Sequence, residues 1–256
     1  MKFSKVHSLG NDFIFIGSPS SSPCPDNSFI VQSCNRKLGI GADGFIVISR
    51  SRVADYRMRI FNSDGSEAEM CGNALRCSAG YVVESGYSTK KSFTVETLAG
   101  IRKAVIENDG VKAYIGKPNI TDSGVIAVNG KELSYVSVST GNPHCVIFGN
   151  PLTDDEFFTL APKIERHPLF PQGTNVEFAS VTHSGSILMR VWERGVGETL
   201  ACGTGSTAAA FAAYSAGLCG STTDVHQKGG ILKCCITEDD AWVKGSYTLV
   251  FRGEIN

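Results

Sequence analysis

The pattern of apolar and polar positions predicts a protein rich in β-strands. Residues 55–61 and 93–107 alternate with a period of two, with valine, isoleucine, phenylalanine and tyrosine at the apolar positions. Two segments, 71–86 and 202–217, instead predict long helices, and each ends at a glycine of the kind that follows a helix C-terminus. The second segment is so rich in alanine and so poor in charge that we expect it to be buried on nearly all sides.

The chain also repeats itself at an offset of 131 residues. Methionine, arginine, glutamate, cysteine and glycine recur in register in the longest matching block. The matching blocks are 58–73 with 189–204, 8–11 with 139–142 and, at an offset shorter by one, 100–103 with 230–233. Because this period far exceeds the roughly 20–50 residues of stacked repeats, it indicates a duplicated domain.

These patterns predict an α/β (α+β) protein of two pseudo-symmetric domains, each a curved, mainly antiparallel sheet wrapped around a central helix. We expect the N-terminal half at 1–116, completed by 247–256, and the C-terminal half at 117–246. Residues 117–124 are expected to link the halves, and residues 17–28, rich in proline and serine, to form a loop. The chain of 256 residues is long enough for two such cores.

Composition and charge exclude several classes of protein. Hydrophobic residues make up 42% of the chain and charged residues 19%, as in ordinary globular proteins. A formal net charge of −1 offers no surplus of positive charge for a nucleic acid. No apolar run approaches the roughly 18 residues of a membrane helix, and the first residues do not form a secretory signal. We therefore expect a cytoplasmic protein without nucleic-acid or membrane partners.

Residues 39–44 match the glycine pattern of dinucleotide-binding loops, GxGxxG. That motif requires a strand before it and a helix after it. Here a helical segment precedes the glycines and a strand follows them, so the sequence predicts a turn.

Two of the nine cysteines, Cys71 and Cys202, differ from the rest. The nine form no paired CxxC clusters, so no metal site is expected, and seven are interpreted as small buried hydrophobic residues. Cys71 and Cys202 begin the two predicted helices, at equivalent places in the repeat. A helix N-terminus presents unpaired N–H groups and a positive dipole end, which bind a carboxylate and lower the pKa of a thiol.

One acid–base group from each half suggests inversion at carbon. If Cys71 and Cys202 face each other across a cleft, a thiolate removes a Cα proton from one face and a thiol returns a proton to the other. The sequence therefore predicts a two-base racemase or epimerase.

Five segments resemble the signature blocks of the diaminopimelate epimerase family and span nearly the whole chain. They are 7–13, 61–77, 140–146, 173–178 and 192–205. The resemblance implies the family's two-domain fold, a homodimer and a pyridoxal-independent enzyme with no cofactor or metal. It also implies the interconversion of LL- and meso-2,6-diaminopimelate, a small-molecule substrate of lysine and peptidoglycan synthesis.

The resemblance also assigns roles to residues. Cys202 matches the base for the LL substrate and Cys71 the acid, while His144 and Glu193 match positions that tune the thiols. Positions that hold the reacting carboxylate are matched by Gly72, Asn73, Gly203 and Thr204. Those that hold the amino groups and the distal carboxylate are matched by Asn11, Asn62, Asn142, Asn175, Glu193 and Arg194.

The sequence leaves the substrate range and the roles of two glutamates open. Gly44 stands where several family members have a substrate-contacting glutamine, which leaves the breadth of substrate open. Glu67 and Glu198 recur near the cysteines, and the sequence does not separate a capping role from a catalytic one. Two other functions are a related two-cysteine racemase or isomerase of a small carboxylic acid, and a carboxylate-binding module without turnover. The segment 193–199, together with the set of matching asparagines, argues against a proline-type racemase.

Overall fold

The computed structural model describes residues 1–21, 23 and 25–255, and the chain divides into two compact units. The first unit comprises Met1–Tyr114 and Lys244–Asn256, and the second comprises Ile115–Val243. These divisions fall within three residues of the boundaries expected at 116 and 246. Strands β8 (Gly110–Gly116) and β17 (Ala241–Gly245) contain the two division points.

The first unit is built around a sheet in the order β18-β1-β2-β3-β4-β6-β7-β8, with β5 added to β4. The pairs β2–β3 and β4–β6 are parallel, and the other pairs are antiparallel. Its remaining strands are β1 (Lys2–Ser8), β2 (Asn11–Gly17), β3 (Gly44–Ser49), β4 (Tyr56–Asn62), β5 (Glu67–Ala68), β6 (Ser92–Thr97), β7 (Gly100–Glu107) and β18 (Thr248–Glu254). Its helices are α1 (Asn27–Cys34) and α2 (Gly72–Glu84).

The second unit repeats this arrangement, in the order β9-β10-β11-β12-β13-β15-β16 with β14 added to β13. Here β11–β12 and β13–β15 are the parallel pairs. The strands are β9 (Asn119–Val128), β10 (Lys131–Ser139), β11 (Pro143–Phe148), β12 (Asn175–Val181), β13 (Ile187–Glu193), β14 (Gly197–Glu198), β15 (Thr222–Gln227) and β16 (Gly230–Ile236). The helices are α3 (Asp154–Glu165) and α4 (Gly203–Ser215).

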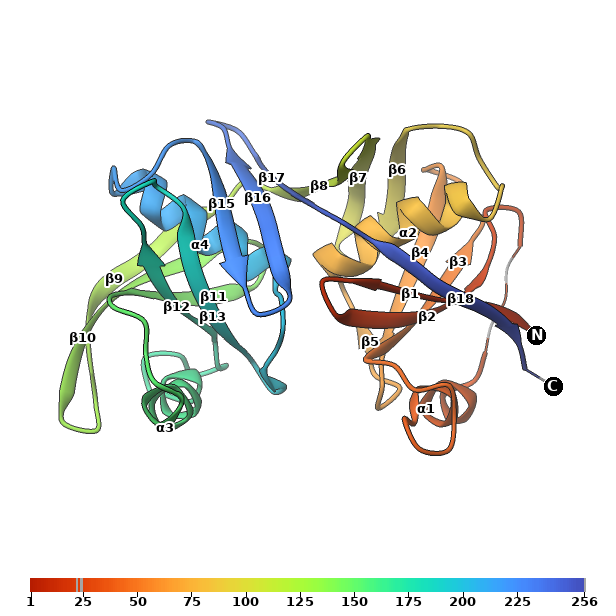
Figure 1. Ribbon diagram of the computed structural model, residues 1–256. Helices are drawn as coiled ribbons and strands as arrows, with labels where there is room; N and C mark the ends of the chain where they lie inside the picture. The colour runs from red at the N-terminus through yellow and green to blue at the C-terminus, as the bar shows by residue number, and fades with distance from the viewer. Residues whose placement is uncertain (22, 24, 256) are drawn as a thin grey trace. The chain divides into compact units, whose positions relative to one another are not determined.

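In each unit one helix lies among the strands (Figure 1). Helix α2 contacts β1, β2, β4, β7 and β18, and helix α4 contacts β10, β11, β12, β13, β15 and β16. Every residue of α2 from Gly72 to Val82 is buried. Gly86 and Gly217 follow the two helices with φ of 72° and 71°, a conformation that glycine adopts without strain. The predicted mixed α+β fold, with a mainly antiparallel sheet around a central helix in each half, is confirmed.

Strand registers follow the same offset as the sequence repeat. Phe13 pairs with Gly44 across β2 and β3, and His144 pairs with Asn175 across β11 and β12. The later hairpins match at the shorter offset, since β6–β7 begins with Ser92 opposite Val105 and β15–β16 with Thr222 opposite Cys235. The first hairpins differ, with Ser8 opposite Asn11 but Ser139 opposite Pro143. Equivalent positions from β2 and β11 onward can therefore be compared directly.

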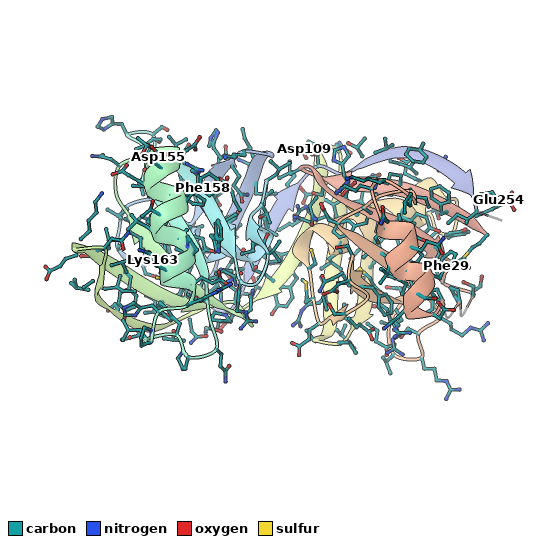
Figure 2. The ribbon with its side chains drawn as sticks, turned by 90° about the horizontal axis from the view of Figure 1, so that it is seen from below. Phe29, Asp109, Asp155, Phe158, Lys163 and Glu254 are labelled. Carbon is teal, nitrogen blue, oxygen red and sulfur yellow. The ribbon has the colours of Figure 1, made fainter. Side chains whose placement is uncertain are left out.

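The two remaining helices, α1 and α3, pack against further strands of their own units. Helix α3 contacts β9, β12 and β13, and its Phe157, Leu160 and Ile164 are buried there. A capping box of Thr153 and Glu156 begins this helix. Figure 2 labels Phe158 on α3 and Phe29 on α1, which contacts β3. Among the described residues, no helix has both the length and the apolar character that crossing a membrane requires.

One expectation about connections is wrong. Residues 117–124 do not form a free linker, because Asn119–Val128 is strand β9 and pairs with β10 along its whole length. The polar residues that suggested a linker lie on this largely exposed strand. The loop expected at 17–28 ends earlier, because Asp26 caps α1 through the amide of Phe29. Of that loop, Ser22 and Cys24 lie outside the described residues.

The turn predicted at residues 39–44 is confirmed. Helix α1 precedes it and strand β3 follows it, which is the reverse of the order in a dinucleotide-binding motif.

Candidate active site

In the first unit, Cys71 is the N-cap residue of α2, as predicted. Its backbone is extended, with φ −144° and ψ 121°, and its side chain makes no capping bond to the helix. The thiol instead donates to Oδ1 of Asn11 over 3.8 Å, and the same oxygen accepts from Nδ2 of Asn73 at 3.2 Å. The fold therefore brings together three of the predicted site residues, although Asn11 is 60 residues away from Cys71.

Two residues that the sequence analysis missed fix this group. Oδ2 of Asp43 accepts from Nδ2 of Asn11 at 3.1 Å, which leaves Oδ1 of Asn11 directed at Cys71. Arg76, fully buried in α2, donates to Oγ of Ser8 at 2.7 Å and to the side-chain oxygen of Asn73. A charged residue in the middle of a predicted helix was the signal that could have pointed to Arg76.

The other two first-unit residues lie at the ends of β3 and β4. Gly44 and Asn62 are opposite each other in these strands. Nδ2 of Asn62 donates to Oγ of Ser66 at 2.9 Å, within the turn that follows β4. A Cβ atom on Gly44 would lie 2.8 Å from the carbonyl oxygen of Phe61 and 3.2 Å from the ring of Phe13. Neighbouring atoms therefore occupy the space that a side chain at position 44 would need.

In the second unit, Cys202 is the N-cap residue of α4, again as predicted. Its sulfur accepts from the amide of Gly205 at 3.4 Å and lies 3.4 Å from Oγ1 of Thr204. Its own amide donates to Oε1 of Gln227 at 2.8 Å, and Nε2 of Gln227 donates to Oγ of Ser206. Gln227 thus anchors the first turn of α4, a role that the sequence pattern did not indicate.

The expectation of a lowered thiol pKa is wrong for Cys202. Burial raises the pKa of this thiol well above its ordinary value, and the negative charges of Glu193 and Glu177 raise it further. Thr204 and the amide of Gly205 act in the opposite direction, as expected at a helix N-terminus, but the combined effect of burial and the two carboxylates is larger. Only 6% of Cys202 is exposed, so water contributes little to solvating a thiolate.

Glu193 lies beside this thiol. Burial raises the pKa of its carboxyl group, while bonds from Thr199 and Cys202 and the nearby His144 favour the charged form. Thr199 donates its hydroxyl to Oε1 of Glu193. Glu193 is therefore placed to exchange a proton with Cys202.

His144 lies in a buried chain of polar groups. Its Nδ1 atom is 2.7 Å from Oε1 of Glu177, and its Nε2 atom is 3.1 Å from Oδ1 of Asn142. The side-chain oxygen of Asn142 also accepts from the hydroxyl of Thr140 at 2.9 Å. Predicted site residues His144 and Asn142 are thus in contact, and Glu177 is an addition that the sequence analysis did not single out.

Asn175 and Arg194 are joined through the backbone. Oδ1 of Asn175 accepts from the amide of Arg194 at 3.0 Å, and Nδ2 donates to the carbonyl oxygen of Pro143 at 2.8 Å. The guanidinium of Arg194 is exposed and donates to the carbonyl oxygen of Gln172 at 3.3 Å. Asn175 therefore holds the backbone on which Arg194 is presented.

The two repeated glutamates each form an ion pair with an arginine. Glu67 binds Arg59, with Nε to Oε1 at 2.7 Å, and Glu198 binds Arg190, with Nε to Oε1 at 2.9 Å. The two ion pairs occupy equivalent positions at the offset of 131. Each links the body of a strand to the short hairpin that leads to the cysteine helix.

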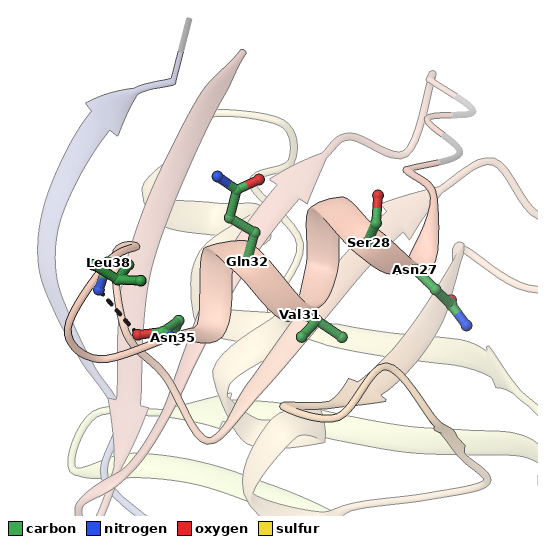
Figure 3. Close-up of a pocket in the computed structure, with 6 residues that line it drawn as sticks. All are labelled: Asn27, Ser28, Val31, Gln32, Asn35 and Leu38. Atoms are coloured by element: carbon green, nitrogen blue, oxygen red, sulfur yellow. Dashed lines mark hydrogen bonds between the residues drawn. The ribbon is translucent and has the colours of Figure 1, made fainter.

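The hollow next to α1 is not formed by predicted site residues. It has a volume of about 500 Å³ (Figure 3) and is lined by Asn27, Ser28, Val31, Gln32, Asn35 and Leu38.

In the part of the chain that the structure describes, no cluster of three or more His, Cys, Asp or Glu side chains could hold a metal ion. Four of the remaining cysteines are buried as interpreted, namely Cys34, Cys77, Cys145 and Cys234, whereas Cys219 and Cys235 are partly exposed.

Comparison with known proteins decides the family. The family model described as diaminopimelate epimerase matches residues 3–121 and 136–250. The chain belongs to the diaminopimelate epimerase family. It is 42% identical over 274 residues to a diaminopimelate epimerase of Caldanaerobacter subterraneus subsp. tengcongensis, covering 100% of this chain and 99% of that protein. It is also 42% identical over 275 residues to that of Desulfitobacterium hafniense, covering 99% and 97%. The expectation of an isomerase of this family is confirmed.

Solved structures place this diaminopimelate epimerase family member within a wider fold group. A Bacillus anthracis protein of the phenazine biosynthesis PhzF family superposes with a TM-score of 0.77 at 20% identity, covering 100% of this chain and 99% of that chain. A hydroxyproline epimerase from Agrobacterium vitis, with bound trans-4-hydroxy-L-proline, gives a TM-score of 0.76 at 16% identity, covering 99% and 91%. At these identities the likeness concerns the fold alone.

Proposed function

We propose that the protein interconverts LL- and meso-2,6-diaminopimelate by proton transfer through Cys71 and Cys202. The observation that carries this proposal is that each unit places a cysteine at the N-cap of its central helix, in contact with a predicted substrate residue: Cys71 with Asn11 and Cys202 with Thr204. A two-base reaction requires the two thiols to reach one carbon atom from opposite faces.

Cys202 takes the Cα proton of the LL substrate in this proposal, and Cys71 supplies a proton to the other face. The roles exchange in the reverse direction. The backbone N–H groups of Gly72, Asn73, Gly203 and Thr204 hold the reacting carboxylate, because the first N–H groups of a helix have no partner within it and favour an anion. The same N–H groups also stabilise the negative charge that develops as the proton leaves the carbon.

Glu193 supports the base. A buried thiol must lose its proton before it can act as a base, and Glu193 is a buried carboxylate whose charge acts on Cys202. Burial raises the pKa of Glu193 and so makes it a stronger proton acceptor than an exposed glutamate. His144 adds positive charge when protonated and supports the charged form of Glu193.

The remaining residues bind the substrate's amino groups and distal carboxylate. We assign this role to Asn11, Asn62, Asn142 and Arg194, with Asn175 and Gly44 shaping the same region. The guanidinium of Arg194 is exposed and its backbone is held by Asn175, which suits bidentate binding of a carboxylate.

The test is incubation of the protein with LL-diaminopimelate in deuterated water, followed by chiral separation and mass spectrometry. We expect the meso isomer to appear with one deuterium at the inverted carbon. Binding without deuterium uptake or inversion would identify a carboxylate-binding module instead. Inversion of proline or glutamate but not of diaminopimelate would identify a different racemase.

We also propose that the enzyme needs no pyridoxal phosphate or metal, forms a homodimer and acts in the cytoplasm. Reduced thiols at positions 71 and 202 are required by the mechanism, and a reducing compartment keeps them so. Activity that survives dialysis against a chelator, a mass of two chains by light scattering, and recovery of the protein in the cytoplasmic fraction are the expected results. A strict metal requirement would contradict the proposed independence from metal, and a monomeric active species would contradict the proposed homodimer.

A further inference from the structure

The pair formed by His144 and Glu177 is entirely buried. Neither side chain has exposed surface, and Nδ1 of His144 lies 2.7 Å from Oε1 of Glu177. Oε2 of Glu177 is buried without a hydrogen-bond partner among the described residues. Burying a carboxylate with half of its acceptor sites unused costs stability, so the pair requires an explanation.

The first unit shows that the fold does not require this pair. At the offset of 131, His144 corresponds to Phe13 and Glu177 to Ile46. The strands that carry them have the same register, with Phe13 opposite Gly44 in one unit and His144 opposite Asn175 in the other. Phe13 and Ile46 are buried as well. Equivalent positions of the two units are therefore filled by an apolar pair in the first unit and by a polar pair in the second.

Glu177 also touches the helix that begins at Cys202. A Cβ atom on Gly205 would lie 2.6 Å from Oε1 of Glu177, so this carboxylate is packed against the first turn of α4. On its other side the pair reaches Asn142, through Nε2 of His144 at 3.1 Å. Glu177 thus connects the turn that follows Cys202 with a residue to which we assign substrate binding.

Hydrogen bonding by His144 depends on Glu177. With a carboxylate at 2.7 Å, Nδ1 carries a proton and donates it, which fixes the orientation of the ring. Oδ1 of Asn142, which can only accept, lies 3.1 Å from Nε2, so Nε2 donates as well. Without Glu177, the ring loses its acceptor at Nδ1, and the orientation in which Nε2 meets Asn142 is no longer fixed.

We propose that Glu177 is a positioning residue for the reaction at Cys202, holding His144 with Nδ1 protonated and thereby fixing the side chain of Asn142. This inference rests on the proposed function. Glu177 does not touch the substrate in this scheme and acts only through His144 and the first turn of α4. The charged and titratable groups near Cys202 are Glu177 on β12, His144 on β11 and Glu193 on β13.

Two variants test the proposal. Glu177→Gln keeps the size of the side chain and removes its charge. The double variant His144→Phe with Glu177→Ile places the first unit's own apolar pair in the second unit, where the strand register is the same. Because replacing both partners leaves no unpaired charge, this variant provides a folded control for the loss of the pair.

Three measurements are made on each variant and on the wild type: the midpoint of urea unfolding, the initial rate of inversion of LL-diaminopimelate, and the rate of iodoacetamide labelling of Cys202 against pH. The Cys71 peptide serves as the internal reference for labelling.

We expect kcat of Glu177→Gln to fall about 100-fold, within the range of a disturbed acid–base group, with a smaller change in KM. The labelling curve of Cys202 should move to lower pH and that of Cys71 should stay in place. The double variant should unfold near the wild-type midpoint. It should invert the substrate no faster than Glu177→Gln does.

The proposal is wrong if Glu177→Gln inverts the substrate at the wild-type rate. It is equally wrong if activity falls only in proportion to folded protein while the Cys202 labelling curve does not move, because a merely structural role predicts that pattern. Failure of the proposed function looks different: the wild type itself would show no inversion, whereas the labelling shift at Cys202 requires no substrate and would still be observed.

Discussion

The side-chain oxygen of Asn11 lies 3.8 Å from the sulfur of Cys71 and accepts its S–H. The orientation of the amide is set from behind, because Nδ2 of Asn11 donates to Asp43 at 3.1 Å. Asp43 in turn binds Arg36, with Oδ1 2.7 Å from Nη2. A residue outside the predicted site therefore decides which end of the Asn11 amide faces the thiol.

Replacing Asp43 with alanine should weaken catalysis more than folding. Without Asp43, Asn11 loses the bond that fixes its amide, and we expect kcat/KM to fall by about 10- to 100-fold, as for a misplaced catalytic contact. The stability change should be about 1 kcal/mol, because the ion pair is partly exposed. Steady-state kinetics and urea unfolding measure the two effects. Arg36→Gln is the control, since it removes the ion pairs of Arg36 with Asp43 and Asp12 and keeps the bond from Asn11 to Asp43. Equal losses in both variants would argue against amide orientation.

Replacing each cysteine with alanine should separate the two half-reactions. Either variant should lose inversion by about 100-fold or more, because each removes one acid–base group. Cys202→Ala should keep some deprotonation of the meso isomer only, and Cys71→Ala of the LL isomer only. A β-halogenated analogue, which eliminates halide after deprotonation, reports this step directly. A single-base enzyme would behave differently, with one variant inactive toward both isomers and the other nearly unaffected.

Removing the carboxylate of Glu193 should lower the pKa of the Cys202 thiol and also slow the inversion of the substrate. The negative charge of Glu193 raises the pKa of the Cys202 thiol, so Glu193→Gln should lower that pKa. At one pH near neutrality a larger fraction of the thiol is then ionised, and iodoacetamide labelling of Cys202 should be faster than in the wild type. Inversion should nevertheless slow, because the proton acceptor beside Cys202 is lost.

Glu198→Gln is the matched control for this experiment, since Glu198 follows in the same hairpin but binds Arg190 and Lys228. It should leave the labelling of Cys202 unchanged. Slower labelling in Glu193→Gln would show that Glu193 favours the thiolate, which is the opposite of what repulsion between two negative charges predicts.

A glutamine at position 44 should destabilise this protein. Its Cβ would lie 2.8 Å from the carbonyl oxygen of Phe61, so the strands must shift, and overpacking of this kind costs about 1–3 kcal/mol. Urea unfolding of Gly44→Gln measures the loss. Gly149→Ala serves as the control, because no atom lies within 4 Å of a Cβ there. Wild-type stability of Gly44→Gln would show that the strand ends accommodate a side chain, and its turnover of glutamate and aspartate would then report on selectivity.

The sequence by itself determined the repeat, the central helices and the two cysteines at their N-termini. Each depends on local information. A period of two or 3.6, a glycine after a helix and an offset of 131 are readable without contacts between distant residues. Cys71 and Cys202 were identified because both begin a predicted helix at equivalent places in the repeat, and a helix start can be recognised from local sequence.

Only the tertiary structure decided which polar groups share a bond. Asp43 is 32 residues from Asn11, and Glu177 is 33 residues from His144, yet each pair is in contact because β-strands bring distant segments side by side. The repeat did contain a signal for Glu177, since a glutamate there aligns with the buried Ile46. The pKa of Cys202 could not be read from its helix position, because burial and two carboxylates from other strands outweigh the helix N-terminus, and those contributions exist only once the chain is folded.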